Sequence, residues 1–456
     1  MLSFPTIIGT MSEDQKPKLN LFDITMIVIG LVIGMGIFRT AKDAAQASLT
    51  PAIFFAAWIV GGLVAFCGAL TYAEIGSRFP VTGGYYKVFS YSYHPSIAFS
   101  INCIILISNA ASLSGVALIG SEYITPLIFG PGPHNLGQPL IAIAAIIVFY
   151  GVNLMGLRMS ATTQNVLMLI KILMLLVLVA ALFFPSLYNS NPMPVADAGR
   201  KSFMAFLLSF GVALKATSFT YGGYQQTINF GGEVRNPQKN IPRGIFIGIL
   251  VIITLYLSVS YSYYKVIGFT ELKSTTGIAS IVAEKMLGPA GNYLSSVLLF
   301  IAVLAYVNVS LLSNPRVMFA MAEDGILPKA FTRKDDKKDV LTVSLTVFAA
   351  TCVIVIFFAD TFDKILSFTI FLDSIGMATS AATIFVLRKR TKHLDGTGIF
   401  SMKLYPLLPI IFVLAYLFVG TVIAITFPQY ALIGISVFSF FLLVYFLTKK
   451  AVKPKK

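Results

Sequence analysis

Long apolar blocks alternate with short polar stretches along this chain. Most of the twelve blocks approach the ~20 residues that cross a hydrocarbon core of ~30 Å. They cover residues 21–38, 52–73, 97–119, 140–154, 166–184, 203–221, 245–264, 294–320, 341–358, 365–387, 404–427 and 430–447. None shows the alternating polar and apolar positions of a transmembrane β-strand, so helices must satisfy the backbone hydrogen bonds. The pattern predicts an all-α membrane protein with 12 transmembrane helices.

Glycine interrupts two of the predicted helices. Gly34 and Gly36 interrupt helix one toward the end of the first block, and Gly222 next to Gly223 interrupts helix six directly after the sixth block. Inside a membrane, a backbone that leaves the helix is tolerated only where it lines a cavity or is buried in protein. The two interruptions lie five helices apart, as the first helices of two inverted repeats would. They therefore predict a 5+5 inverted-repeat fold with unwound helices 1 and 6.

This arrangement divides the chain into five parts. They are a cytoplasmic tail (1–20), a first repeat of five helices (21–185), a second repeat (203–388), two C-terminal helices (404–448) and a basic tail (449–456). The first part has no apolar run followed by a cleavage site, so it does not read as a signal peptide. Most of the 34 Lys and Arg residues fall on one side when both ends are placed inside, which predicts cytoplasmic N- and C-termini.

A broken helix exposes unpaired N–H groups at the start of one half and carbonyl groups at the end of the other. The zwitterion of an α-amino acid offers charges that complement both. The competing interpretation is that these glycines only let helices pack closely, the commonest role of small residues in membrane helices. Two breaks in corresponding helices favour a substrate site.

Composition narrows the function further. The chain is 57% hydrophobic and only 12% charged, with a mean hydropathy of +0.83. Its net charge of +15 resides in short loops, where anionic lipid headgroups rather than nucleic acid are the natural neighbours. The three cysteines and three histidines show no metal-ligand spacing, so we expect no metal, no cofactor and no enzyme activity. A channel would need charged rings or a repeated filter sequence, and neither is present.

Five segments resemble the amino acid/polyamine/organocation transporters, specifically the L-type amino acid transporter group. They are residues 33–38 (IGMGIF), 72–76 (YAEIG), 219–224 (FTYGGY), 233–243 (EVRNPQKNIPR) and 322–328 (AEDGILP). The loop at 233–243 is the most specific match. The resemblance extends over nearly the whole chain. It implies alternating access in a 5+5 inverted-repeat transporter of amino acids.

The resemblance favours a sodium-independent transporter of neutral L-amino acids, either an exchanger or proton-coupled. A cationic amino acid or polyamine exchanger is the alternative, and an amino acid sensor on the same scaffold is a third. The implied substrate site consists of Val32, Ile33, Gly34, Met35, Gly36, Phe219, Thr220, Tyr221, Gly222, Gly223 and Tyr224. In it the substrate carboxylate meets backbone N–H groups around Gly34, the amino group meets carbonyls of both breaks, and Phe219 is an aromatic lid.

Lys171 lies near the middle of the fifth block, where an isolated ammonium group is costly and marks a functional candidate. It matches the lysine that sodium-independent relatives use where sodium-coupled relatives bind a cation. The resemblance implies that it bridges helices 1 and 8 or helps release substrate. A lysine that merely faces a water-filled crevice is the alternative.

Three positions depart from the group's usual pattern. Met35 stands where a small hydroxyl residue is common, Tyr224 stands where many members have tryptophan, and Lys215 stands where an uncharged residue is usual. Asp373 and Glu122 are candidate partners of Lys215 in a buried ion pair. The other interpretation is that Lys215, with Asp373, selects the substrate side chain.

The loop sequences bear on which proteins could associate with this chain. The group's heterodimeric animal members carry a cysteine between helices 3 and 4, and residues 126–139 contain none. We therefore expect no disulfide-linked heavy chain, and a monomer or homodimer in a lipid bilayer. The short loops favour a bacterial inner membrane protein.

Overall fold

The computed structural model describes residues 18–34, 36–130, 132, 136–189, 202–275, 277–357 and 362–451, without the side chains of Phe219, 362–370, Tyr430 and 448–451. The described chain is helical and contains no strand beyond isolated β-bridges. Its α-helices are α1 (Leu21–Val32), α2 (Gly36–Ala47), α3 (Pro51–Arg78), α4 (Gly84–Ser92), α5 (Pro95–Phe129), α6 (Gly137–Leu154), α7 (Leu157–Ala180), α8 (Phe203–Tyr221), α9 (Pro237–Val266), α10 (Phe269–Leu272), α11 (Ile278–Leu287), α12 (Pro289–Glu323), α13 (Thr342–Phe357), α14 (Phe362–Arg390), α15 (Leu407–Thr426) and α16 (Pro428–Ala451). Short 3-10 helices are η2 (Ala181–Phe183), η3 (Pro185–Leu187), η5 (Tyr224–Asn229), η6 (Lys329–Thr332) and η8 (Lys392–Leu394).

Eight of the described helices are long and apolar enough to cross a membrane, and α1 with α2 makes a ninth if the bent pair is one span. The eight are α3, α5, α6, α7 extended by η2, α9, α12, the 371–390 part of α14, and α15. Shorter apolar helices lie within α8, α13 and α16. The all-α membrane class is therefore confirmed, whereas the count of twelve stays a prediction.

Proline and small polar residues set where several helices begin. Pro51, Pro95, Pro237, Pro289 and Pro428 are the first residues of α3, α5, α9, α12 and α16. Proline is favoured there because its fixed φ suits the helix and its missing N–H would have no intrahelical partner. At the start of α1, the side chains of Asn20 and Asp23 each accept a hydrogen bond from the other's backbone N–H.

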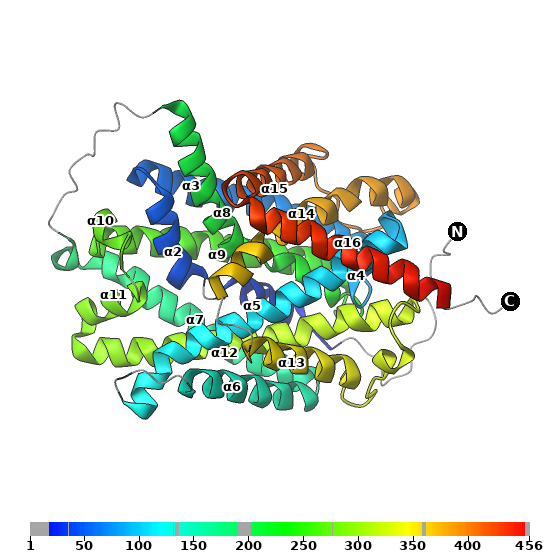
Figure 1. Ribbon diagram of the computed structural model, residues 1–456, viewed down its shortest axis with the longest axis horizontal. Helices are drawn as coiled ribbons and strands as arrows, with labels where there is room; N and C mark the ends of the chain where they lie inside the picture. Colours follow the sequence, from blue (N-terminus) through cyan, green and yellow to red (C-terminus); the bar gives the residue numbers. More distant parts are fainter. Residues whose placement is uncertain are drawn as a thin grey trace.

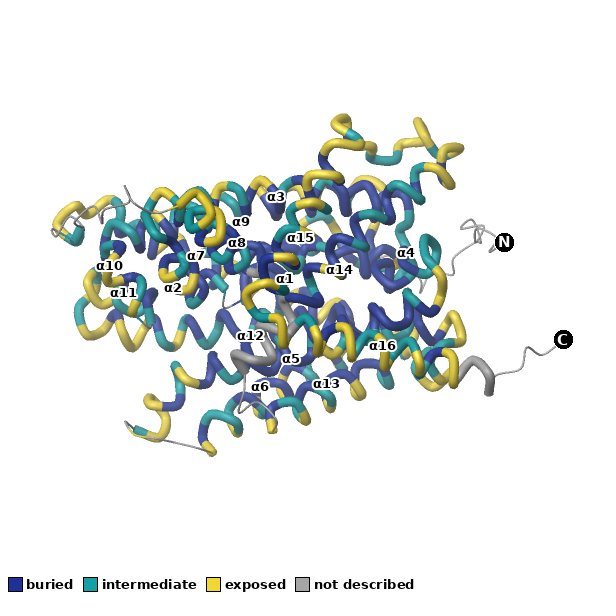
Figure 2. The backbone as a smooth tube through the Cα atoms, turned by 45° about the horizontal axis from the view of Figure 1, so that its top comes forward, coloured by how far each residue is buried: buried dark blue, intermediate teal, exposed yellow. Residues whose placement is uncertain are grey.

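The distribution of buried and exposed residues is the one expected of a membrane-spanning helix bundle. Buried residues form the centre of the bundle and exposed ones its periphery (Figure 2). Large apolar side chains such as Leu63 and Leu173 are more than half exposed on outward helix faces. Such a surface would be unstable in water but is matched by lipid.

The bundle has two distinct ends. Its N-terminal end, where α1 begins, is marked by the β-bridges Leu19↔Val234 and Thr82↔Phe230 and by the start of α5 beside Tyr445. Figure 1 shows α4 and the end of α16 at this end, on the right, and α10 and α11 at the opposite end. The helix breaks lie between these two ends, in the middle of the bundle.

Candidate functional site

The first block of the sequence forms two helices rather than one. α1 ends at Val32, α2 begins at Gly36, and the two are bent by about 40°. α2 continues to Ala47, nine residues beyond the end of the first apolar block at residue 38. Met35 lies outside the described residues. The bend leaves carbonyl groups at the end of α1 and N–H groups at the start of α2 without intrahelical partners.

The carbonyl groups that end α1 face different neighbours. The Val32 carbonyl oxygen accepts hydrogen bonds from the backbone N–H of Gly34 at 2.8 Å and from the Tyr256 hydroxyl at 3.2 Å. The Ile33 carbonyl oxygen accepts a hydrogen bond from Nζ of Lys171. These contacts hold the end of α1 at a fixed place between α7 and α9.

The second break follows α8 at Gly222 and Gly223, after which the chain continues as η5. Gly223 has φ +118° and lies so close to α1 that a Cβ atom there would be 2.1 Å from the Leu31 carbonyl oxygen. Only glycine fits both the conformation and the approach. The two breaks that sequence spacing predicted are therefore in direct contact.

A cavity of about 630 Å³ joins the two breaks. Of the predicted site residues, those that line it are Val32, Gly34, Gly36, Thr220, Gly222, Gly223, Lys215 and Asp373. At the far side from α1 its walls include Lys42, Gln46, Glu122 and Ile278, which belong to α2, α5 and α11. The cavity thus runs from the breaks toward the end opposite the N-terminal end.

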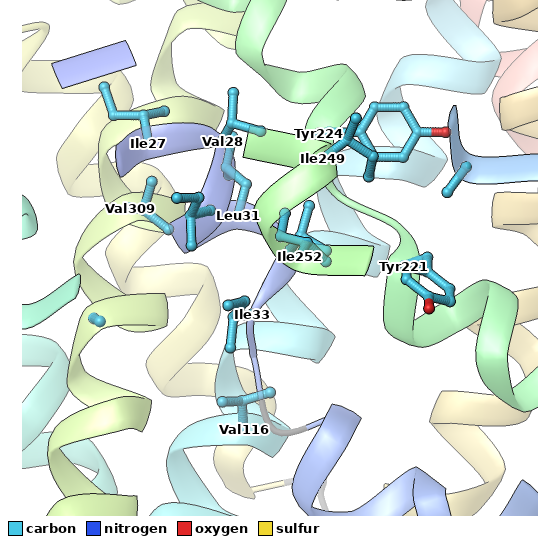
Figure 3. Close-up of a cluster of buried hydrophobic side chains, with 14 of the residues drawn as sticks. Ile27, Val28, Leu31, Ile33, Val116, Tyr221, Tyr224, Ile249, Ile252 and Val309 are labelled. Atoms are coloured by element: carbon cyan, nitrogen blue, oxygen red, sulfur yellow. The ribbon is translucent and has the colours of Figure 1, made fainter. Parts of the chain in front are cut away.

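Ile33, Tyr221 and Tyr224 are not among the cavity's lining residues. Both tyrosines are buried, and Tyr221 packs edge-on against Trp58 and donates a hydrogen bond to that residue's carbonyl oxygen. Figure 3 shows Leu31, Ile33, Tyr221 and Tyr224 within the apolar cluster around the end of α1. These side chains support the breaks from behind. The side chain of Phe219, our predicted lid, lies outside the described residues.

Lys171 also lies behind the cavity rather than in its wall. Its side chain is completely buried and reaches the Ile33 carbonyl oxygen from α7. Among the described residues it has no carboxylate partner within 4 Å. The predicted contact with the first helix is present, whereas no polar contact from Lys171 to α12 is formed.

Lys215 does not form the ion pair with Asp373 or Glu122 that the sequence suggested. Its Nζ lies 4.8 Å from the ring centroid of Phe427, and the carboxylate that acts on it electrostatically is Asp43. A cation over an aromatic face is stabilised by the ring quadrupole. Sequence reasoning missed this contact because Phe427 sits at the corner between α15 and α16, which no local pattern reveals.

A polar stripe on α5 was also missed. Ser108, Asn109 and Ser112 lie on one face of this helix, and Asn109 and Ser112 line the cavity. The Ser112 and Tyr306 hydroxyls are hydrogen-bonded at 2.9 Å, and Asn109 donates to Asn314 at 2.6 Å. The available signal was three polar residues within five positions of a predicted membrane-spanning block.

The N-terminal end of the bundle is closed by ion pairs. Asp339 contacts Lys18 at 2.8 Å and Lys334 at 2.5 Å, and Arg316 Nε lies 3.2 Å from Glu233 Oε1. Burial raises the pKa of Glu233, an effect that Arg316 only partly offsets. Burial also opposes ionisation of Asp339, but its two lysine partners outweigh burial and lower its pKa.

In the described part of the chain, no three His, Cys, Asp or Glu side chains come together. The backbone of both breaks lines the cavity: Leu31 and Val32 at the end of α1, Gly36 at the start of α2, and the Gly222–Gly223 segment. Partial charges of both signs at helix ends suit a small zwitterion.

Known proteins share this sequence pattern. A model of the amino acid permease family matches residues 19–448. The chain is 28% identical to the serine/threonine exchanger SteT of Bacillus subtilis, over 90% of this chain and 92% of that one. It is likewise 28% identical to the branched-chain amino acid permease BcaP of B. subtilis, over 95% and 94%, and 24% identical to the large neutral amino acids transporter small subunit 2 of Oryctolagus cuniculus, over 95% and 80%. The chain belongs to the amino acid permease family.

Proposed function

We propose that this permease carries neutral L-amino acids across the membrane by alternating access, without sodium. The backbone of the amino acid lies between the two helix breaks, with its carboxylate at the N–H groups of α2 and its amino group at the carbonyls of α1 and Gly222. The cavity that joins both breaks supports this placement. Relatives named for serine/threonine exchange, branched-chain amino acids and large neutral amino acids support a neutral substrate.

The observation that carries sodium independence is the contact between Lys171 and the Ile33 carbonyl oxygen. A carbonyl at the end of a broken helix is a typical ligand of a coupling cation. Here a buried ammonium group holds that carbonyl, so the lysine stands in for the ion. A role of Lys171 in substrate release follows, because opening at the N-terminal end would require α1 to leave this contact.

The proposal includes the architecture of the whole chain. The eight clear spans, the bent α1–α2 pair and the shorter apolar helices of α8, α13 and α16 make twelve. The first ten divide into two repeats of five, each starting with a broken helix. Both termini are cytoplasmic in a plasma membrane, and the protein acts as a monomer or homodimer without a disulfide-linked heavy chain. The cavity then faces outward and the ion-paired end is the closed cytoplasmic gate.

Uptake of radiolabelled amino acids into proteoliposomes tests this function. The panel compares neutral and cationic amino acids and polyamines, with and without sodium, a proton gradient or internal amino acid. We expect uptake of neutral amino acids that is unchanged by replacing sodium with choline. Stimulation by internal amino acid would identify exchange, and stimulation by a proton gradient would identify symport. Sodium-dependent uptake, or uptake confined to polyamines, would contradict the proposal.

A further inference from the structure

Asp373 is a carboxylate with unfilled hydrogen-bonding capacity in the wall of the cavity. It lies on α14 and is partly buried. The hydrogen bond it accepts comes from the Ser108 hydroxyl at the long distance of 3.4 Å. Within the described ranges, no Lys, Arg or His nitrogen lies within 4 Å of it. An ionised carboxylate at membrane depth is costly unless donors satisfy its oxygens.

Neighbouring polar side chains are occupied elsewhere. The Ser112 and Tyr306 hydroxyls bond to each other, and the Ser374 hydroxyl donates to the Phe371 carbonyl oxygen at 2.6 Å. Asn109 Nδ2 donates to Asn314 on α12. These donors are used in holding the helices together. Tyr416 also lines the cavity, close enough to Asp373 for the two groups to interact electrostatically. A molecule that fills the cavity can supply further donors.

Residues of α5 and α12 connect Asp373 to the first helix break through a series of contacts. The Tyr306 ring lies 3.5 Å from where a Cβ atom on Gly34 would be, so this residue borders the first break. Tyr306 is bonded to Ser112, and Ser108, which contacts Asp373, lies one turn away on α5, a rise of ~6 Å. Asp373 therefore lies about one turn of α5 from the residues that border the first break, within reach of the side chain of a molecule whose backbone lies at Gly34.

We propose that Asp373 is a specificity-determining residue that accepts a hydrogen bond from the substrate side chain, and that the preferred substrates are neutral amino acids ending in a donor such as a hydroxyl group. This inference rests on the proposed function. A hydroxyl donating to a carboxylate forms a charge-assisted bond, which is about twice as strong as a neutral one. An aliphatic side chain at the same place leaves the carboxylate without a partner, and sites built to bond a hydroxyl reject its aliphatic isostere.

Threonine and valine test this selection, because they have the same shape and differ by one hydroxyl group. Initial rates of both are measured in proteoliposomes for wild type, Asp373→Asn, Asp373→Leu and the control Thr379→Val. Thr379 is also on α14, does not line the cavity, and bonds to its own helix. We expect wild type to prefer threonine by about tenfold or more in kcat/KM, since one charge-assisted bond contributes at least that factor.

The variants distinguish an effect on substrate selection from a general effect on the structure of the protein. Asp373→Leu should bring the threonine-to-valine ratio close to one, and Asp373→Asn, which keeps one acceptor oxygen, should lower the ratio about threefold. Thr379→Val should keep the wild-type ratio. Equal losses for both substrates, or an unchanged ratio in Asp373→Asn, would overturn the inference. Faster transport of lysine than of threonine would also overturn it. If wild type transports neutral amino acids with a threonine-to-valine ratio near one, the inference is overturned but the proposed function stands.

Discussion

The backbone of Gly223 lies directly against the carbonyl oxygen of Leu31, so the two broken helices touch where each leaves its helical path. A Cβ atom at this glycine would lie 2.1 Å from that oxygen. The contact makes the breaks one unit, because neither can shift alone. It also explains why the sequence has glycine at this position, two residues after the sixth apolar block.

Gly223→Ala should therefore separate the breaks and impair transport. The substitution strains a backbone at φ +118° and pushes α1 away, and misplacement of about 1 Å at a site costs up to about a hundredfold in rate. We expect at least a tenfold loss of uptake at normal expression. Gly151→Ala is the matched control, since no atom lies within 4 Å of the added Cβ. Equal uptake by both variants would refute the coupling of the breaks.

Lys171→Met keeps the apolar stem of the side chain and removes its ammonium group. The Ile33 carbonyl then loses a charged donor in a buried place, which costs about 1.5–3 kcal/mol. We expect uptake to fall at least about tenfold, measured as initial rate per reconstituted protein. Lys42→Met, at the exposed side of the cavity, should retain most activity. Wild-type uptake by Lys171→Met would show that the lysine has no coupling role.

The stability of the closed N-terminal end should depend on pH through Glu233. Because burial raises the pKa of Glu233 above its ordinary 4.5, the closed state binds a proton at this carboxyl more tightly than a state in which the carboxyl is exposed to water. The closed state is therefore favoured as pH falls toward the raised pKa. Asp339, whose pKa is lowered, stays ionised over this range, so its pairs with Lys18 and Lys334 persist.

We expect alkylation of a cysteine placed at Ser77, near this end, to slow in wild type as pH falls from neutrality toward 4.5, the ordinary pKa of a glutamate. Glu233→Gln, whose side chain is neutral at every pH, should alkylate more slowly at pH 7 and lose most of this pH dependence. Rates are compared after correction for the intrinsic pH dependence of thiol reactivity on an exposed control cysteine. The same pH profile in wild type and Glu233→Gln would contradict the assignment.

A buried charge cluster fixes the α3 and α14 ends. Glu74 is completely buried, contacts Arg78 and Arg388 at 2.7 Å each, and accepts a hydrogen bond from the Met402 N–H at 2.8 Å. Removing it leaves Arg388 without its carboxylate partner, whereas Arg78 keeps Asp395 at 2.7 Å, and breaking a buried pair costs about 3–5 kcal/mol. Glu74→Ala should thus lower the thermal unfolding temperature in detergent markedly, whereas Glu323→Ala, at a partly exposed pair, should change it little. Similar unfolding temperatures would show that the cluster contributes little.

How much of the fold and of the candidate site could be predicted from the sequence depended on the kind of residue. Gly34, Gly36, Gly222 and Gly223 predicted the breaks because glycine in an apolar helix is a local signal with few explanations. The buried position of Lys171 could be predicted because this residue lies within an apolar block, far from the polar residues on either side of it.

Tertiary contacts were not predictable in the same way. Tyr221 and Tyr224 were expected in the site but point into the core, because the direction of a side chain beside a break depends on the packing of other helices. The predicted carboxylate partners of Lys215 were wrong for the same reason. The side chain that it contacts belongs to Phe427, which is more than two hundred positions away in the sequence. Polar residues of α5 carried no information about which helix they face.

Protection of a single cysteine tests the central claim, that an amino acid binds between the two breaks without sodium. Cys67, Cys103 and Cys352 are replaced, and cysteine is introduced at Ser112 in the cavity or at Gln46 toward its open side. The account predicts that a transported amino acid slows alkylation at position 112 in sodium-free buffer, with much less effect at position 46. Unprotected alkylation at position 112 in a variant that still transports, or protection that requires sodium, would contradict it.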